Sequence, residues 1–212
     1  ASTTDAWIAL SPTTASGNST LMVKVTENTT NATRNGIISV TMGDKTLNVS
    51  VSQNGKFLTI ANTALSYTSK GGSIDITIST NDNWTARVEG NATWITTSQT
   101  SGSGTANIKV IAADNPSVNS RSGYVVIETP HGQNVRVLLT QDARYLTVDN
   151  SALTFYSNGG TSEPITVSTD GTYSISTSQY WLTISQSANT FTVNASENTG
   201  IEARFGKITI AL

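Results

Sequence analysis

Cysteine is absent from this chain of 212 residues, histidine occurs once, and charged residues make up only 12% of the sequence. Without cysteine there are no disulfides, thiolate metal sites or cysteine nucleophiles; the compartment stays open, because bacterial surface proteins often lack cysteine. The net charge of -2 and the isoelectric point near 5.3 give no electrostatic basis for binding nucleic acid or an anionic membrane. No apolar run is long enough to span a bilayer, so membrane insertion is excluded as well.

Recognisable sets of catalytic residues are also missing. The single histidine, His131, stands in "TPHGQN" between two predicted strands, and we interpret it as a solvated turn residue. One histidine cannot supply a Ser-His-Asp triad or a multi-histidine metal site. The acidic residues are spread singly, which disfavours a glycosidase-type carboxylate pair, and Asx-rich turns explain "NDN" at 81–83 and "DN" at 114 better than calcium binding does. We therefore predict a protein that is not an enzyme, with no metal and no cofactor.

The sequence repeats with a period of about 87 residues. "WIALS" at residue 7, "WITTS" at 94 and "WLTIS" at 181 place one tryptophan in each period. Downstream of each tryptophan come an acidic residue, an asparagine and, six residues after the asparagine, an arginine at 34, 121 or 204. Upstream, "FLTIANTALSYTSKGGS" from Phe57 matches "YLTVDNSALTFYSNGGT" from Tyr145. These landmarks indicate three copies of one unit.

We divide the chain into a partial first repeat at 1–55, a complete second repeat at 56–142 and a third repeat at 143–212 that lacks its last strand. A sandwich without its final strand exposes an unpaired edge, and a half sandwich buries too little surface to be stable alone. Something outside these residues is expected to complete both repeats. The alternatives are further sequence of a longer protein, flanking segments, or strands of neighbouring subunits that pair with the open edges.

Period-two hydrophobicity predicts β-strands throughout the chain. In "SIDITIST", Ile74, Ile76 and Ile78 share one face of a strand, while polar residues take the other. Turn signals such as "KGG", "TNDN", "SGSG" and "TPHGQN" divide the second repeat into seven or eight short strands. No segment has the pattern of an amphipathic helix. We therefore expect an all-β fold of tandem immunoglobulin-like antiparallel β-sandwiches, with about 87 residues per repeat.

The order of "LSYTSKGGS", "STNDNW", "WITTS", "SGSG", "DN" and "RSGYVVI", followed by a strand that ends in glutamine, resembles the BACON family. The name stands for Bacteroidetes-associated carbohydrate-binding, often N-terminal. The resemblance covers essentially the whole chain, as one complete and two partial copies. The third copy departs from it, because Tyr173 stands where the second copy has Trp84 and because the glycine-rich "SGSG" segment is missing.

The resemblance implies an immunoglobulin-like sandwich in a surface or secreted protein of gut bacteria, or of phages that infect them. It also implies neighbouring glycoside hydrolases or proteases. The carbohydrate-binding role in the family name was itself inferred from such neighbours, and a plain spacer is an accepted alternative. Expected partners are therefore glycans or mucin, together with neighbouring subunits or further domains of the same longer chain.

Recurring residues are better candidates for structural roles than for ligand binding. Trp7, Trp94 and Trp181 begin a strand in every copy, which favours core anchors over sugar-stacking platforms. The arginine of each copy is interpreted as a loop anchor whose guanidinium bonds carbonyls of the asparagine-containing loop or the preceding acid.

Two tyrosines that do not recur are the candidate ligand-binding residues. Tyr156 has Thr68 as its counterpart, and Tyr180 has Thr93. We expect a non-catalytic extracellular or cell-surface array that acts as a spacer or adhesion module, with glycan contacts at these tyrosines. The alternative is a structural subunit of a fibre, an appendage or a phage particle that assembles by pairing of strand edges.

Overall fold

The computed structural model describes residues 1–212 and is all-β, with twenty strands and no helix. None of its segments could cross a membrane as an apolar helix. Contacts divide the chain into two compact units. The first unit comprises Ala1–Leu65, Ser73–Ile111 and Gly123–Leu138, and the second comprises Ser66–Gly72, Ala112–Ser122 and Leu139–Leu212.

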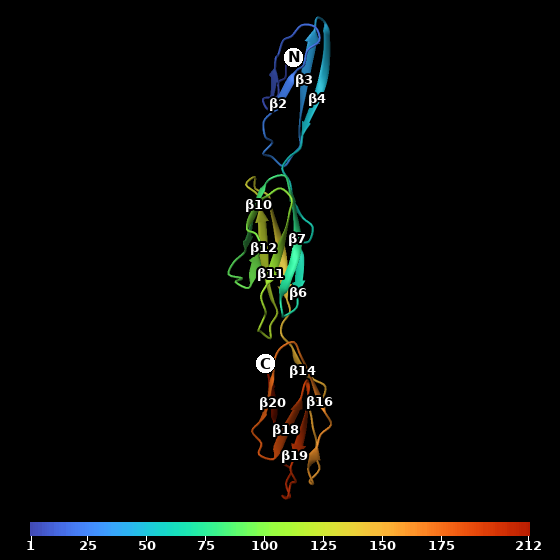
Figure 1. Cartoon of the computed structure of the whole chain (residues 1–212), viewed down its shortest axis with the longest axis vertical. Helices are drawn as coiled ribbons and strands as arrows, with labels where there is room; N and C mark the ends of the chain where they lie inside the picture. Colours follow the sequence, from blue (N-terminus) through green and yellow to red (C-terminus); the bar gives the residue numbers. More distant parts are fainter. The chain divides into compact units, whose positions relative to one another are not determined.

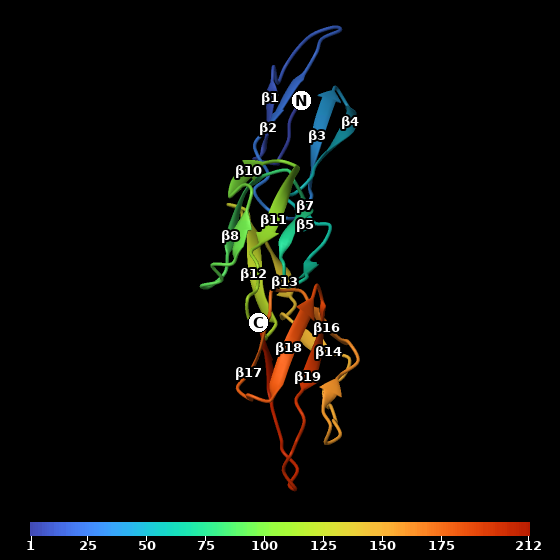
Figure 2. The same cartoon turned by 60° about the horizontal axis from the view of Figure 1, so that its bottom comes forward.

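The first repeat is built from two antiparallel hairpins. Its strands are β1 (Ile8–Ser11), β2 (Met22–Val25), β3 (Arg34–Met42) and β4 (Lys45–Gln53). β1 pairs with β2, and the longer β3 pairs with β4 through a turn at Gly43, whose φ of 56° suits glycine (Figures 1 and 2). A bridge between Ser2 and Ser39 ties the segment that precedes β1 to β3. The outer edge of β4 has no partner strand.

The second repeat is a sandwich of a five-stranded and a four-stranded sheet. Its strands are β5 (Leu58–Ile60), β6 (Ala64–Tyr67), β7 (Gly72–Thr80), β8 (Asn83–Val88), β9 (Ile95–Thr97), β10 (Ser101–Ser103), β11 (Ala106–Ala112), β12 (Arg121–Glu128) and β13 (Asn134–Gln141). The sheet orders are β10-β8-β12-β13-β6 and β5-β7-β11-β9. The predicted alternation is confirmed, because Ile76 and Ile78 of β7 are buried while Asp75 is exposed.

The predicted strand count of the second repeat was too low, because nine strands form. The difference includes the "SGSG" segment, which was expected to be a turn. Ser101–Ser103 instead forms the edge strand β10, in which Gly102 lies opposite Trp84. Trp84 is only 1% exposed and donates a hydrogen bond from Nε1 to the carbonyl of Gly104 at 3.2 Å. A side chain at residue 102 would collide with the indole ring.

The third repeat contains seven strands. They are β14 (Leu146–Val148), β15 (Gly160–Thr161), β16 (Ile165–Thr169), β17 (Ser174–Thr177), β18 (Leu182–Ser187), β19 (Thr190–Ala195) and β20 (Ile208–Ala211) (Figure 1). β14, β16, β19 and β15 form one sheet with β18 paired to β19, and β17 pairs with β20. Phe191, Val193 and Ile165 lie in its core. Residues 151–156, whose counterparts in the second repeat include β6, form no strand.

The recurring tryptophans are half-buried rather than fully buried. In each copy the next residue enters the core instead, as Ile8, Ile95 and Leu182. Trp181 packs against the core of the third repeat from its edge. The expectation of core anchors therefore holds only in part, because the fully buried tryptophan is Trp84, which does not recur.

Candidate functional site

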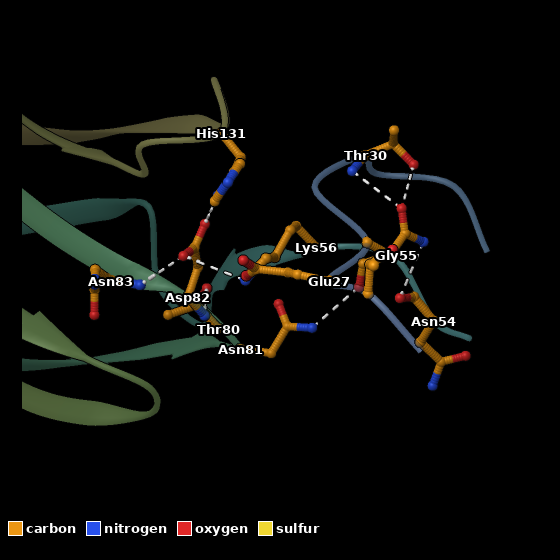
Figure 3. Close-up of polar contacts among 12 residues, drawn as sticks. Glu27, Thr30, Asn54, Gly55, Lys56, Thr80, Asn81, Asp82, Asn83 and His131 are labelled. Carbon is orange, nitrogen blue, oxygen red and sulfur yellow. Dashed lines mark hydrogen bonds and ion pairs between the residues drawn. The ribbon is translucent and has the colours of Figure 1, made fainter. Parts of the chain in front are cut away.

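Four charged or titratable side chains converge where the first repeat meets the second (Figure 3). Lys56 lies two residues before β5, and its Nζ lies 2.6 Å from Oε1 of Glu27 and 3.5 Å from Oδ1 of Asp82. Nδ1 of His131, in the turn between β12 and β13, lies 2.5 Å from Oδ2 of Asp82. The lysine and the imidazole thus reach the same carboxylate from different directions.

Asp82 is the nearly buried centre of this cluster, with a side chain only 6% exposed. It occupies the tight turn between β7 and β8, where its amide donates to Oγ1 of Thr80 at 3.1 Å. The Asn83 amide donates to its Oδ1 at 2.9 Å. Burial by itself would raise the pKa of Asp82, but the bonds from His131 and Asn83 and the charge of Lys56 outweigh it, so this pKa is lowered.

Lys56 and Glu27 stabilise each other's charged form. The hydrogen bond to Glu27 raises the pKa of Lys56 even though burial opposes it, and the same bond lowers the pKa of Glu27. The Lys56 amide also donates to the carbonyl of Thr30 at 2.7 Å. The basic residue is therefore held to the first repeat at two points, by its side chain and by its backbone.

The partner loop of Lys56 recurs in every repeat, and we name it the Asn loop (residues 27–32, 114–119 and 197–202). The asparagine Oδ1 accepts the amide two residues later, at 3.2 Å for Asn28, 3.2 Å for Asn115 and 3.3 Å for Asn198. Its Nδ2 donates to the carbonyl four residues later, at 2.8, 3.0 and 2.9 Å respectively. Each Asn loop is an Asx turn fixed by its own side chain.

The contact between the second and third repeats has the same basis. Arg144, the counterpart of Lys56, places its guanidinium 2.5 Å from Oδ2 of Asp114, the counterpart of Glu27. The Arg144 amide donates to the carbonyl of Ser117 at 2.9 Å, as the Lys56 amide does to Thr30. Asp170, the counterpart of Asn81, accepts from the Tyr145 amide as Asn81 does from the Phe57 amide, and here it also accepts a hydrogen bond from Ser69 of the second repeat, which lowers its pKa.

We name this two-point contact the clasp: Lys56 with Glu27 and Thr30 at the first junction, and Arg144 with Asp114 and Ser117 at the second. Lys56 and Arg144, the basic half of the clasp, were not predicted from the sequence, although a signal existed. Lys56 and Arg144 both stand directly before the matched segments "FLTI" and "YLTV". A cation that recurs at the start of a repeat and an acid that recurs near the end of the preceding one predict such a pair.

The structural interpretation of the recurring arginines is confirmed. Nη2 of Arg34 donates to the carbonyl of Thr26 at 2.6 Å, Arg121 donates to Ala113 and Asp114, and Arg204 donates to Ser196. Nε of Arg34 and of Arg121 adds a bond of 2.8 Å to Gln53 and Gln141, the glutamines that end β4 and β13. The guanidinium of Arg34 stacks 4.5 Å from the ring centroid of Trp7, and that of Arg204 stacks 4.2 Å from Trp181.

The interpretation of His131 as a solvated turn residue is confirmed only in part. The residue does lie in a turn, but its side chain is only 25% exposed, because it packs against the Asp82 carboxylate. Sequence spacing could not reveal this contact, since the two residues lie in different turns that the sandwich brings together. For "DN" at 114, the Asx turn is present, because Asn115 Oδ1 accepts the Ser117 amide. For "NDN" at 81–83, the Asn81 side chain instead bonds a distant segment, accepting from the Phe57 amide and donating to the Gly55 carbonyl. No group of three or more His, Cys, Asp or Glu residues could hold a metal ion.

The two candidate ligand-binding tyrosines both lie on the surface of the third repeat. Tyr156 is 87% exposed and Tyr180 is 94% exposed. Tyr156 precedes the turn that ends at Gly159, and Tyr180 precedes Trp181 at the start of β18. Exposure of this extent leaves both rings free to stack on a ligand, but the structure does not bring them into one site.

Tyr156 borders a cleft of about 810 Å³ in the third repeat, whereas Tyr180 does not line it. The apolar lining of the cleft includes Leu146, Leu182, Phe191, Val193, Ile208 and Ile210. Arg204, Phe205 and Asn198 also line it. Polar and apolar groups contribute about equally to the surface of the cleft.

Comparison with protein families matches the whole length of the chain. Residues 1–54 match the BACON family model, described as "Putative binding domain, N-terminal". Residues 57–144 and 145–212 match a second model, described as "Viral BACON domain". A comparison with curated protein sequences finds no match.

Solved structures with a similar arrangement of strands include a GH5 xyloglucanase from Bacteroides ovatus in complex with a XXXG heptasaccharide. It is 18% identical with a TM-score of 0.39, and the match covers 41% of this chain and 19% of the xyloglucanase. The periplasmic chaperone SfaE is 9% identical with a TM-score of 0.35, over 67% of this chain and 85% of the chaperone. Domains 5-6 of the S-layer protein SbsC are 14% identical with a TM-score of 0.32, over 74% of this chain and 92% of that one.

Proposed function

The chain belongs to the BACON family, and we propose on that basis that it is a non-catalytic extracellular array of β-sandwiches that spaces or attaches a surface or secreted protein. The observation that carries this function is the clasp, which joins both pairs of consecutive repeats by the same ion pair and the same backbone bond. A clasp at each junction restricts the motion of one repeat against the next, as a spacer or projecting stalk requires.

Several titratable residues are engaged in structural contacts, which supports a role without catalysis. Glu27 and Asp114, which recur, pair with basic residues, and the single histidine, His131, pairs with Asp82. A general base must instead be free to reach a substrate proton. The chain would therefore act through its surfaces, as part of a gut-bacterial or phage protein at the cell surface or in the medium.

If the array attaches to a glycan, the exposed tyrosines would make the contact. Tyr156 and Tyr180 each present an uncovered ring of the kind that stacks on sugars. We expect the chain to bind at least one mucin or dietary glycan on a glycan array. Binding should fall at least about tenfold in the double variant Tyr156→Ala with Tyr180→Ala, whereas Tyr145→Ala, at a surface tyrosine outside the cleft, should leave it unchanged. If the wild-type chain binds no glycan, the adhesive role is rejected and the spacer role stands.

The alternative function, assembly through strand edges, is favoured by one observation. Leu47 and Val49 on β4 are 73% and 53% exposed. A strand with exposed apolar side chains is able to pair with another chain. Light scattering after size exclusion tests this role, because a mass that stays monomeric from micromolar to millimolar concentration contradicts self-assembly.

A further inference from the structure

The third Asn loop has the conformation of the other two but holds no basic residue. Glu197 occupies the position of Glu27 and Asp114, is exposed and forms no ion pair. The Asx turn around Asn198 is nevertheless closed, with the Gly200 amide bonded to its Oδ1 at 3.3 Å. The carbonyl of Gly200 stands where Thr30 and Ser117 accept the amide of a basic residue. The third Asn loop therefore has both acceptors of a clasp, the Glu197 carboxylate and the Gly200 carbonyl.

The surroundings of this loop repeat the second junction as well. The Asn198 amide donates to the carbonyl of Ser157 at 2.7 Å, just as the Asn115 amide donates to the carbonyl of Ser69 at 2.6 Å. At the second junction the hydroxyl of Ser69 also donates to Asp170 of the next repeat. Ser157 is exposed, so its hydroxyl is available for an equivalent carboxylate. The third Asn loop thus has the same set of groups as the second junction: the Ser157 hydroxyl as donor, and the Glu197 carboxylate and the Gly200 carbonyl as acceptors.

We infer that the third Asn loop is a docking surface for the basic leading edge of another β-sandwich repeat of this kind. The partner carries Lys or Arg directly before the aromatic residue that leads into its first strand, as Lys56 precedes Phe57 and Arg144 precedes Tyr145. Its cation pairs with the Glu197 carboxylate, its amide donates to the Gly200 carbonyl, and an aspartate in its second turn accepts from Ser157.

Charge complementarity selects this partner over other occupants. Both occupied loops bind a cation with the acid at this position, at 2.6 Å in the first junction and 2.5 Å in the second. A carboxylate with an adjacent free carbonyl repels anions and offers two acceptors to a donor-rich group. The inference rests on the proposed role as an array and specifies which chemical group continues it.

The test extends the chain after Leu212 with a second copy of residues 130–212. This adds a copy of β13 and a further repeat with its own leading arginine. Hydrogen exchange of that arginine's amide is then compared with exchange of the Arg144 amide in the same molecule. We expect both amides to be protected, and Glu197→Lys should accelerate exchange of the added one by about tenfold. Asp114→Lys, the matched control, should do the same to Arg144 alone.

Exchange of the added arginine at the rate of an unstructured peptide would overturn the inference. The inference would also be overturned if Glu197→Lys left the exchange rate of the added arginine's amide unchanged while Asp114→Lys accelerated exchange of the Arg144 amide. A second measurement needs no added repeat: in the 212-residue chain, Glu197→Lys should leave the melting temperature unchanged, whereas Asp114→Lys should lower it. An equal drop would assign Glu197 a role inside the third repeat and reject docking. Glycan binding by the tyrosines is independent of each of these outcomes.

Discussion

Nζ of Lys56 lies 2.6 Å from Oε1 of Glu27, and these two residues belong to different repeats. The ion pair has an equivalent between Arg144 and Asp114, so it is part of the repeating pattern and not an accident of one surface. An exposed pair alone contributes little to stability. Here the lysine is nearly buried and also faces Asp82, so its removal leaves a carboxylate in the junction without its cation.

Reversal of the charge at Lys56 should weaken the junction of the first two repeats. Lys56→Glu places a third carboxylate beside Glu27 and Asp82, and we expect the melting temperature to fall by roughly 5 °C. Glu27→Lys combined with Lys56→Glu should recover part of the loss, because it restores one opposite-charge pair. Scanning calorimetry measures both. Equal melting temperatures for the single and the double variant would contradict a specific pairing.

Acid should destabilise the same junction through Asp82. Its pKa is lowered in the folded chain, so its ionised form contributes stability above the ordinary value of about 4, and this contribution is lost as the pH falls through the folded value. We expect the melting temperature of the wild type to drop more steeply below about pH 4 than that of Asp82→Asn. Asp44→Asn, in the exposed turn between β3 and β4, is the control and should follow the wild type.

The sequence was sufficient to predict the repeat, most of the strands and the role of the arginines, because these depend on local period and on recurrence. Alternation in β7 and the spacing between Asn28 and Arg34 are repeated elsewhere in the chain, so each was supported more than once. The contacts of Asp82 with His131 and Lys56 were not predictable in this way. They depend on which turns the sheets bring together, and His131 occurs in only one repeat.

The depth to which the recurring tryptophans are buried was not predicted correctly, for a similar reason. Recurrence suggested that Trp94 and its counterparts fill the core, but in the first and third repeats an arginine covers one face of the ring at the edge of the sandwich. Trp84 is the buried indole, and the signal for it was the glycine-rich "SGSG" that accompanies it. The third repeat has Tyr173 at this position and lacks the glycines, so the two features vary together.

The guanidinium of Arg34 should not be replaceable by an ammonium group. It bonds the Gln53 side chain and the Thr26 carbonyl while it stacks on Trp7, and lysine cannot form this fork. We expect Arg34→Lys to cost about 1–2 kcal/mol in the free energy of unfolding, followed by urea denaturation. Arg87→Lys alters an exposed ion pair with Glu128 and should cost no more than about 0.5 kcal/mol. Similar losses at both positions would contradict an anchoring role for Arg34.

Gly102 should tolerate no side chain while Trp84 fills the core beneath it. A Cβ at residue 102 would lie 2.4 Å from Cζ2 of the indole, and the ring is too enclosed to move away. We expect Gly102→Ala to destabilise the chain by about 1–3 kcal/mol in urea denaturation, whereas Ser103→Ala on the exposed neighbour should be nearly neutral. Trp84→Tyr, which copies the third repeat, should make Gly102→Ala less costly because the smaller ring leaves room for the methyl group. If Gly102→Ala costs the same in both backgrounds, the glycine is required for its backbone conformation and not for the tryptophan.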